Sequence, residues 1–360
     1  MSFDSLGWNE HFEQRLRPYA ERGLDPARVV RQDQRYLVRT IAGDRDAEVS
    51  GRFRHEAASR AEFPAVGDWV AVAAPEAGLV VIHAVLERQS AFVRKVAGET
   101  TEAQVVAANV DVVFLISGLD RDWNARRLER YLVAAWESGA RPVIVLNKAD
   151  ACEMLDQRVA EAEAVGAGVP VVAISARTGA GIEALAPWLV PGRTIALLGS
   201  SGVGKSTLVN ALLGEERLRT GAVREIDDRG RHTTTHRELI VLPGGALLVD
   251  TPGMKELQLW GDASSVEDSF SDVAELASGC KFGDCRHEQE PGCAIRAALR
   301  DGSLDPERFA SYRKLGRELR FLEGQRDQRV RLAEKTRWKQ VTKAMRVREK
   351  IEGGWKGRKR

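Results

Sequence analysis

The sequence has 360 residues, of which 43% are hydrophobic and 29% charged, a composition typical of globular proteins with a sizeable core. At roughly 100–200 residues per domain, this length predicts two or three domains. The apolar runs fall far short of the ~20 residues that a membrane span needs, and the N-terminus lacks the apolar stretch of a signal peptide. We therefore expect a cytoplasmic protein that makes no membrane contact, and four cysteines are too few to predict a disulfide scaffold.

Charge is unevenly distributed along the chain. Residues 326–360 hold 14 lysines and arginines against 4 acidic residues, a local net charge of +10, whereas the whole chain has a net charge of only +2. This basic tail indicates a polyanionic partner such as RNA. The alternative is a solvated helix with a frayed end.

The first part of the chain predicts a small β domain. Residues 1–28 form an N-terminal extension, expected to be a short helix and a linker. Residues 29–98 then contain short β-like segments separated by Gly, Pro and Asp, which predict an all-β barrel or sandwich. These segments are Tyr36–Val38, Ala47–Val49, Gly67–Val72 and Gly78–Ile82.

After a transition over residues 99–110, apolar strands alternate with amphipathic helices, which predicts an α/β domain with a mostly parallel sheet covered on both faces. The expected strands are Val112–Ser117, Val143–Leu146, Val169–Ile174, Thr194–Leu198, Glu238–Leu242 and Ala246–Val249. The expected helices are Asn124–Ser138, Glu153–Val165, Ile182–Leu189 and Lys205–Leu213. Beyond about Leu257 the strands stop, and helices return from Pro306.

A phosphate-binding loop is predicted between the strand Thr194–Leu198 and the helix that follows it. The segment matches GxxxxGK[ST] in full, with Gly199, Ser200, Ser201, Gly202, Val203, Gly204, Lys205, Ser206 and Thr207. Such a loop directs backbone N–H groups and the positive end of a helix dipole at phosphate oxygens. Lys205 is expected to reach the β- and γ-phosphates, and Ser206 to bind Mg²⁺. The alternative is a chance glycine-rich turn.

A metal and switch site is predicted further along the chain. Asp250 and Gly253 belong to a DxxG motif at the end of an apolar strand, where the carboxylate would hold Mg²⁺ through water and the Gly253 N–H would meet the γ-phosphate. In the polar segment before it, Thr234 or Thr235 would coordinate Mg²⁺ only while the γ-phosphate is present. A turn after a buried strand and a threonine-rich surface loop are the alternatives.

Two further strand ends predict recognition of guanine. Asn147, Lys148 and Asp150 form an NKxD motif, and Ser175 and Ala176 begin a Ser-Ala-Arg segment. The Asp150 carboxylate can accept hydrogen bonds from guanine N1–H and the 2-amino group, and adenine offers neither donor. Asn147 can secure another edge of the base, Lys148 can cover the ring, and the Ala176 N–H can donate to guanine O6. GTP and GDP are therefore the expected ligands, and an ATPase or kinase is disfavoured.

The order of these motifs is permuted. In Ras-like GTPases the P-loop comes first, then the switches, then NKxD and the Ser-Ala segment. Here NKxD and the Ser-Ala segment precede the P-loop, the switch and DxxG. Because domain termini tend to lie close together at the surface, a circular permutation preserves the site.

The chain thus resembles the circularly permuted, small-ribosomal-subunit-dependent GTPases of bacteria, the RsgA-type family, over residues 29–322. Further landmarks are VGDWV at residues 66–70 and QVVAANVD at residues 104–111. The resemblance implies an N-terminal OB-fold β-barrel, a circularly permuted Ras-like P-loop GTPase domain (99–258) and a C-terminal zinc-binding helical domain (259–325). It also implies binding to the small (30S) subunit and its 16S rRNA, with GTP hydrolysis during late maturation coupled to release. We expect a monomer, with other assembly factors as further partners.

A zinc site is predicted in the C-terminal region. Cys280, Cys285, His287 and Cys293 have the spacing C-x4-C-x-H-x5-C. Three thiolates and one imidazole suit a closed tetrahedral site for structural Zn²⁺, which we expect to contribute about 10 kcal/mol of binding energy to folding. The alternative is three small buried hydrophobic residues and a surface histidine. Cys152 stands apart and is expected to be an inert thiol.

The residue that orients the catalytic water is not apparent. Met254 stands where Ras-like enzymes have a glutamine after DxxG, so intrinsic hydrolysis should be slow. His232 and His236 are candidates for this role, or they are solvated loop residues. Because of Met254, a GTP-dependent RNA-binding or scaffold protein with negligible turnover stays open as an alternative function.

Overall fold

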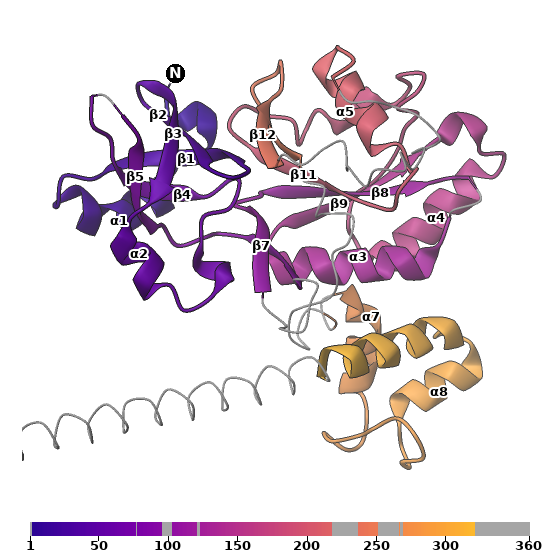
Figure 1. Ribbon diagram of the computed structural model, residues 1–360. Coiled ribbons are helices and arrows are strands. Elements are labelled where there is room, and N and C mark those ends of the chain that lie inside the picture. The colour runs from indigo at the N-terminus through magenta and orange to yellow at the C-terminus, as the bar shows by residue number, and fades with distance from the viewer. Residues whose placement is uncertain are drawn as a thin grey trace, which may run out of the picture.

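The computed structural model describes residues 2–76, 78–95, 103–120, 123–217, 237–250, 266 and 269–320. In Figure 1 an N-terminal barrel lies beside an α/β domain, and a group of C-terminal helices lies beneath helix α3 (Ala125–Ser138) of that domain. Among the described residues, no helix is both long and apolar enough to span a bilayer.

The N-terminal barrel has five strands and is closed. Its strands are β1 (Asp25–Gln32), β2 (Tyr36–Thr40), β3 (Gly43–Val49), β4 (Trp69–Ala73) and β5 (Val80–Val85). They follow the order β1-β2-β3-β5-β4, β4 pairs back with β1, and β3 and β5 run parallel. This closed five-stranded arrangement is that of an OB fold, with the valines and isoleucine of alternate positions buried inside. The helices α2 (Gly51–Glu56) and η2 (Arg60–Glu62) fill the β3–β4 connection.

Strand β1 begins inside the segment that the sequence had suggested as a linker. Pro26 disfavoured a strand there, because proline cannot donate a ladder hydrogen bond. In the structure Pro26 is the second residue of β1 and lies opposite Ala71 of β4. The first 28 residues therefore contribute a strand to the barrel as well as the expected helix.

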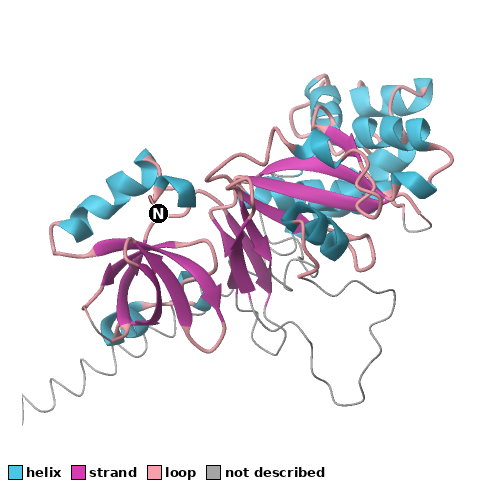
Figure 2. Cartoon of the chain, turned by 90° about the horizontal axis from the view of Figure 1, so that it is seen from above, coloured by secondary structure: helices cyan, strands magenta, loops and turns pink. Residues whose placement is uncertain are grey.

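The N-terminal helices lie across the barrel (Figure 2). These are η1 (Asp4–Leu6) and α1 (Glu10–Ala20), and the Asn9 side chain caps α1 by accepting from the His11 N–H at 3.0 Å. Phe12 and the fully buried Trp69 of β4 pack together with ring centroids 5.9 Å apart. The extension is thus packed onto the barrel by aromatic contacts.

A two-stranded sheet of β6 (Ala91–Lys95) and β7 (Ala103–Ala108) follows the barrel in the chain. Residues 99–110 were expected to be a transition, with no strand named there. β7 pairs antiparallel with β6, and its residues Val105–Ala108 are buried.

The α/β domain contains a six-stranded sheet in the order β10-β9-β8-β11-β13-β12. Its strands are β8 (Val112–Gly118), β9 (Arg141–Asn147), β10 (Val171–Ala173), β11 (Thr194–Leu198), β12 (Arg237–Val241) and β13 (Leu247–Asp250). All neighbours are parallel except β12 and β13, which are antiparallel. The mostly parallel sheet predicted from the alternating pattern is confirmed.

Helices cover both faces of this sheet (Figure 1). Leucines of α3 and α4 (Leu155–Gly166) join one core with Val113 and Leu115, whereas α5 (Lys205–Leu213) joins a second core with Phe114 and Ile116. Successive residues of β8 thus face opposite cores, which is why the strand is apolar throughout. Two short 3₁₀ helices, η3 (Ala149–Ala151) and η4 (Ile182–Leu185), complete the domain. The helix expected over Ile182–Leu189 is shorter because Pro187 disfavours its continuation.

The barrel and the α/β sheet are joined by backbone pairing. Arg31 and Gln32 at the end of β1 lie opposite Glu238 and Arg237 of β12. Nearby, the buried Arg28 donates to the Thr194 hydroxyl at 2.8 Å, and burial lowers the pKa of Arg28 to about 10.

The C-terminal region is helical, as expected. It comprises α7 (Ser271–Ser278), α8 (Ala294–Asp301) and a helix over residues 306–320, with the cysteine-containing loop between α7 and α8.

Candidate functional site

The predicted phosphate-binding loop runs from the end of β11 to the start of α5, and its glycines are sterically required. Gly202 and Gly204 have φ of +82° and +96°, which other residues rarely adopt. A Cβ on Gly204 would lie 2.2 Å from the Asn147 amide nitrogen, and one on Gly199 would lie 2.4 Å from the Ile116 carbonyl oxygen. The loop is therefore closely packed against the ends of β8 and β9, and it leads into the N-terminus of α5, where no side chain caps the helix.

Lys205 lies folded over this loop. Its ammonium group donates to the Gly199 carbonyl oxygen at 2.6 Å and also to that of Ser200. The positive charge and the N-terminus of α5 thus occupy the same small region, as the binding of phosphate requires. Ser206 and Thr207 follow in the first turn of α5, and Ser201 is exposed in the loop.

Asn147 connects the three segments that the sequence analysis had assigned to nucleotide binding. It is buried at the end of β9, with its side-chain nitrogen donating to the Val203 carbonyl oxygen at 2.7 Å. Its side-chain oxygen accepts from the Ala176 N–H at 2.9 Å. The NKxD motif, the Ser-Ala segment and the P-loop therefore meet at one point. The Asn147 amide and the Ala176 N–H, both expected to face guanine, are bonded to each other here.

The other base-recognition residues surround this point. Asp150 forms an ion pair with Arg177, and the pKa of Asp150 is lowered by a hydrogen bond from Ser175 and then by Arg177. Its carboxylate is therefore ionised at neutral pH, as an acceptor from guanine must be. Lys148 has a left-handed backbone with φ of +68° and forms an ion pair with Asp120.

Asp120 is a residue that the sequence analysis missed. It comes two residues after β8, whose last residue Gly118 lies opposite Asn147 of β9. A carboxylate directly beyond an apolar strand, neighbouring the NKxD strand, was the available signal. It could not be used without knowing that β8 and β9 are adjacent.

Asp250 is the last residue of β13, and the P-loop follows the neighbouring strand β11. Val249 of β13 lies opposite Ala196 of β11, so Asp250 ends its strand beside the start of the P-loop. The other expected switch and catalytic residues lie outside the described residues, and their roles stay predictions. They are His232, Thr234, Thr235, His236, Gly253 and Met254.

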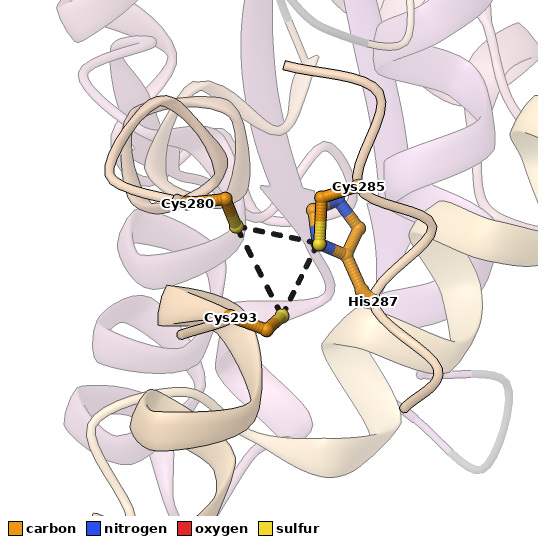
Figure 3. A group of neighbouring side chains, drawn as sticks. All are labelled: Cys280, Cys285, His287 and Cys293. Carbon is orange, nitrogen blue, oxygen red and sulfur yellow. Dashed lines mark hydrogen bonds between the residues drawn. The ribbon is translucent and has the colours of Figure 1, made fainter. Parts of the chain in front are cut away.

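The four expected zinc ligands converge in the C-terminal region (Figure 3). Their ligand atoms all lie within 4.8 Å of one another. The Sγ atoms of Cys280 and Cys293 are 3.9 Å apart, and the His287 Nδ1 lies 3.5 Å from each. Ideal tetrahedral zinc, with Zn–S near 2.3 Å and Zn–N near 2.0 Å, requires ligand separations of about 3.8 Å and about 3.5 Å. The donor set, which also includes Cys285, therefore fits a tetrahedral Zn²⁺ site.

The loop that carries His287 is organised around Glu290. The Glu290 carboxylate accepts from the backbone N–H groups of Arg286, Glu288 and Gln289 at 2.8–3.0 Å. Its own backbone N–H and then these three groups lower its pKa to about 2. His287 itself has a φ of +61°, and burial lowers its pKa. The neutral imidazole is the form that binds zinc. Cys152 is half-buried against the main core, outside this group.

Comparisons with known proteins agree with this arrangement. A family model described as RsgA GTPase matches residues 85–260. The small ribosomal subunit biogenesis GTPase RsgA of Opitutus terrae is 52% identical, over 99% of this chain and all of the relative. That of Syntrophotalea carbinolica is 44% identical, over 95% of this chain and 96% of the relative.

Solved structures show the same fold. The crystal structure of YjeQ from Thermotoga maritima has a TM-score of 0.63 and 29% identity, covering 82% of this chain and 98% of that one. YloQ, described as a circularly permuted GTPase, has a TM-score of 0.59 and 24% identity, covering 82% and 95%. With 52% identity to the Opitutus terrae protein over 99% of its length, the chain belongs to the RsgA GTPase family.

Proposed function

We propose that this chain is a GTPase that binds the small (30S) ribosomal subunit during late maturation, with GTP favouring binding and hydrolysis favouring release. The observation that carries the proposal is the similarity over 99% of the chain to a relative named small ribosomal subunit biogenesis GTPase. The scaffold alternative with negligible turnover is not favoured, because the relatives compared above are named as GTPases.

GTP and GDP would be held by the P-loop and the strand ends that meet at Asn147. The P-loop N–H groups and Lys205 would bind the phosphates, and Asp150 would select guanine. Ser206 and Asp250, with Thr234 or Thr235, would hold the Mg²⁺ ion that neutralises charge on the phosphates. The Ala176 N–H would donate to guanine O6 by exchanging or sharing its bond to Asn147.

The Cys₃His group would hold one structural Zn²⁺, which supplies folding energy rather than chemistry. The ligand separations support this assignment. His232 and His236 are proposed to orient the attacking water only when the subunit is bound, and Met254 keeps intrinsic hydrolysis slow. If the two histidines are instead solvated loop residues, replacing either one should leave the subunit-stimulated turnover unchanged.

The partner is proposed to be 16S rRNA within the subunit, contacted by the OB barrel and the basic tail of residues 326–360, with other assembly factors nearby. We also propose a cytoplasmic monomer with the domain limits given above, except that the barrel starts with β1 at Asp25. Binding to the subunit should weaken steeply as salt is raised, because each phosphate contact releases a counterion.

GTP hydrolysis by the purified protein, alone and with small or large ribosomal subunits, tests the proposal. Small subunits alone should stimulate turnover strongly, and Lys205→Ala should abolish the stimulated rate because it removes a cation from the developing phosphate charge. Slow hydrolysis that neither subunit changes would refute the ribosomal assignment while leaving the nucleotide site in place.

A further inference from the structure

Helix α3 contacts the P-loop through one side chain. The Tyr131 hydroxyl of α3 lies 3.1 Å from the Ser200 hydroxyl. The carbonyl oxygen of the same Ser200 accepts from Lys205, whose ammonium is expected to move to phosphate oxygens when nucleotide binds. A change in the position of Lys205 therefore alters the bonding of the residue that Tyr131 contacts.

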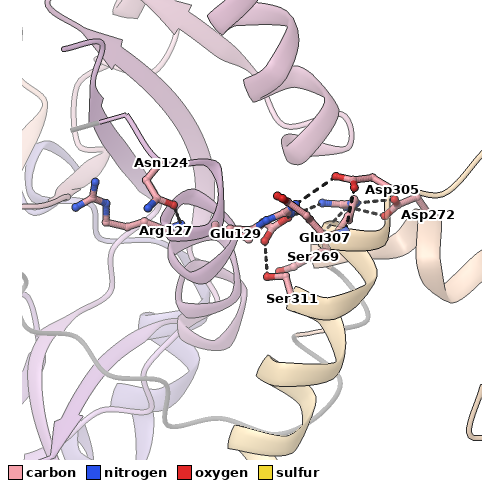
Figure 4. A network of polar contacts seen from close by, with 10 residues as sticks. Asn124, Arg127, Glu129, Ser269, Asp272, Asp305, Glu307 and Ser311 are labelled. Atoms are coloured by element: carbon pink, nitrogen blue, oxygen red, sulfur yellow. Dashed lines mark hydrogen bonds and ion pairs between the residues drawn. The ribbon is translucent and has the colours of Figure 1, made fainter. Parts of the chain in front are cut away.

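The same helix is fixed to the C-terminal region by a buried carboxylate. Glu129 is fully buried and accepts from Arg126 of its own helix at 2.7 Å. It also accepts from Arg308 at 3.3 Å and from the Ser311 hydroxyl at 2.5 Å, both on the helix over residues 306–320. In Figure 4 the side chains of Glu129 and Ser311 point toward each other from the two helices. A buried charge is strongly destabilising without its partners, so this contact resists separation of the helices.

The contact extends to the cysteine-containing loop. Arg308 also forms two bonds of 2.6 Å with Asp272, and its guanidinium lies 4.7 Å from the centre of the Phe270 ring. The next residue, Phe309, packs edge-on against His287, with ring centroids 6.1 Å apart. The contacts thus lead from the P-loop to Tyr131, along helix α3 itself to Glu129, and through the helix over residues 306–320 to a proposed zinc ligand.

We propose that α3 couples the nucleotide site to the zinc-binding region, with Tyr131 as the positioning residue that senses the P-loop and Glu129 as the group that transmits its position to residues 306–320. The proposal rests on the proposed function only in that the P-loop must bind guanine nucleotide. It requires no ribosome.

Coupling between two binding sites is reciprocal, so GDP should change zinc affinity by the same factor by which zinc changes GDP affinity. Because a single neutral hydrogen bond joins Tyr131 to Ser200, we expect GDP to change zinc affinity by about fivefold. The test measures zinc affinity of the full chain by competition with a chelator, with and without Mg²⁺ and GDP. Binding of a fluorescent GDP analogue is measured separately, so that failure of the nucleotide site is distinguished from failure of coupling.

The variants separate coupling from folding. Tyr131→Phe removes only the hydroxyl and should reduce the effect of GDP on zinc affinity to nearly onefold, while zinc affinity without nucleotide stays unchanged. Tyr19→Phe, on α1 of the barrel, is the matched control and should keep the full effect. Ser311→Ala should weaken the coupling from the other end, whereas Ser278→Ala, which removes a local bond within α7, should not.

The zinc-affinity measurements can support or overturn the coupling. Loss of the GDP effect in Tyr131→Phe and Ser311→Ala, with both controls intact, supports the coupling. A wild-type protein that binds GDP tightly but shows the same zinc affinity with and without it would overturn the proposal, as would an undiminished effect in Tyr131→Phe.

Discussion

Replacing Asn147 with alanine should damage both the stability of the GTPase domain and its nucleotide affinity. The change removes the bonds of 2.7 Å to the Val203 carbonyl oxygen and 2.9 Å to the Ala176 N–H, and both backbone groups belong to buried residues. A buried polar group left without its partner costs about 1–3 kcal/mol. Two such groups predict a loss of roughly 2–6 kcal/mol in the free energy of unfolding.

The loss should also appear in binding. Without Asn147 the P-loop and the Ser-Ala segment are no longer held together, so GDP must supply the ordering energy when it binds. If about half of the lost free energy falls on binding, GDP affinity decreases by roughly 5- to 150-fold, since 1.4 kcal/mol corresponds to a factor of ten. Urea denaturation reports the stability, and titration with a fluorescent GDP analogue reports the affinity.

A control separates the two effects. Asn9→Ala removes the cap of α1, which should cost about 1 kcal/mol of stability and leave GDP affinity unchanged. If Asn147→Ala matched the wild type in both measurements, the three segments would not depend on Asn147, and the reasoning would be refuted.

Three further predictions follow from the site. Asp120→Asn should weaken GDP binding about two- to fivefold, since the half-exposed ion pair with Lys148 is worth at most about 1 kcal/mol. An unchanged GDP affinity would show that this ion pair does not contribute to nucleotide binding. The contribution of Asp150 to GDP affinity, measured as the ratio of wild-type to Asp150→Asn affinity, should stay constant from about pH 8 to about pH 5, because Ser175 and Arg177 lower the pKa of Asp150, and a carboxylate with a lowered pKa loses its contribution only as pH falls through that value. A decline in this ratio between pH 7 and pH 6 would contradict the prediction. Removing the metal with a chelator should make the cysteine-containing loop susceptible to limited proteolysis and leave the barrel resistant; an unchanged cleavage pattern would show that the loop folds without zinc.

Much of the site could be predicted because its chemistry is local in sequence. The nine-residue P-loop, the NKxD motif and the cysteine spacing each act over a few residues, and their order alone indicated the circular permutation. The alternating pattern likewise predicted the parallel sheet, since a strand buried on both faces must be apolar throughout. In the C-terminal region, the spacing predicted four zinc ligands, and the structure places their ligand atoms within 4.8 Å of one another.

The remaining features depend on contacts between distant residues. The first half of β1, which contains Pro26, pairs with β4, and β7 pairs with β6. Neither Asp120 nor Tyr131 belongs to a recognisable motif, because each acquires its role from a neighbour that the tertiary structure supplies, Lys148 and Ser200 respectively.

The sequence by itself thus predicted which ligands this chain would bind, since short runs of residues with fixed chemistry indicate phosphate, guanine and zinc. Only the tertiary structure decided how the binding regions are joined. Asn147 bridges segments 29 and 56 residues away, and Glu129 accepts a bond from Ser311, 182 residues further along the chain. Such contacts form only after the sheet order and helix packing have brought the partners together, so no local pattern could reveal them.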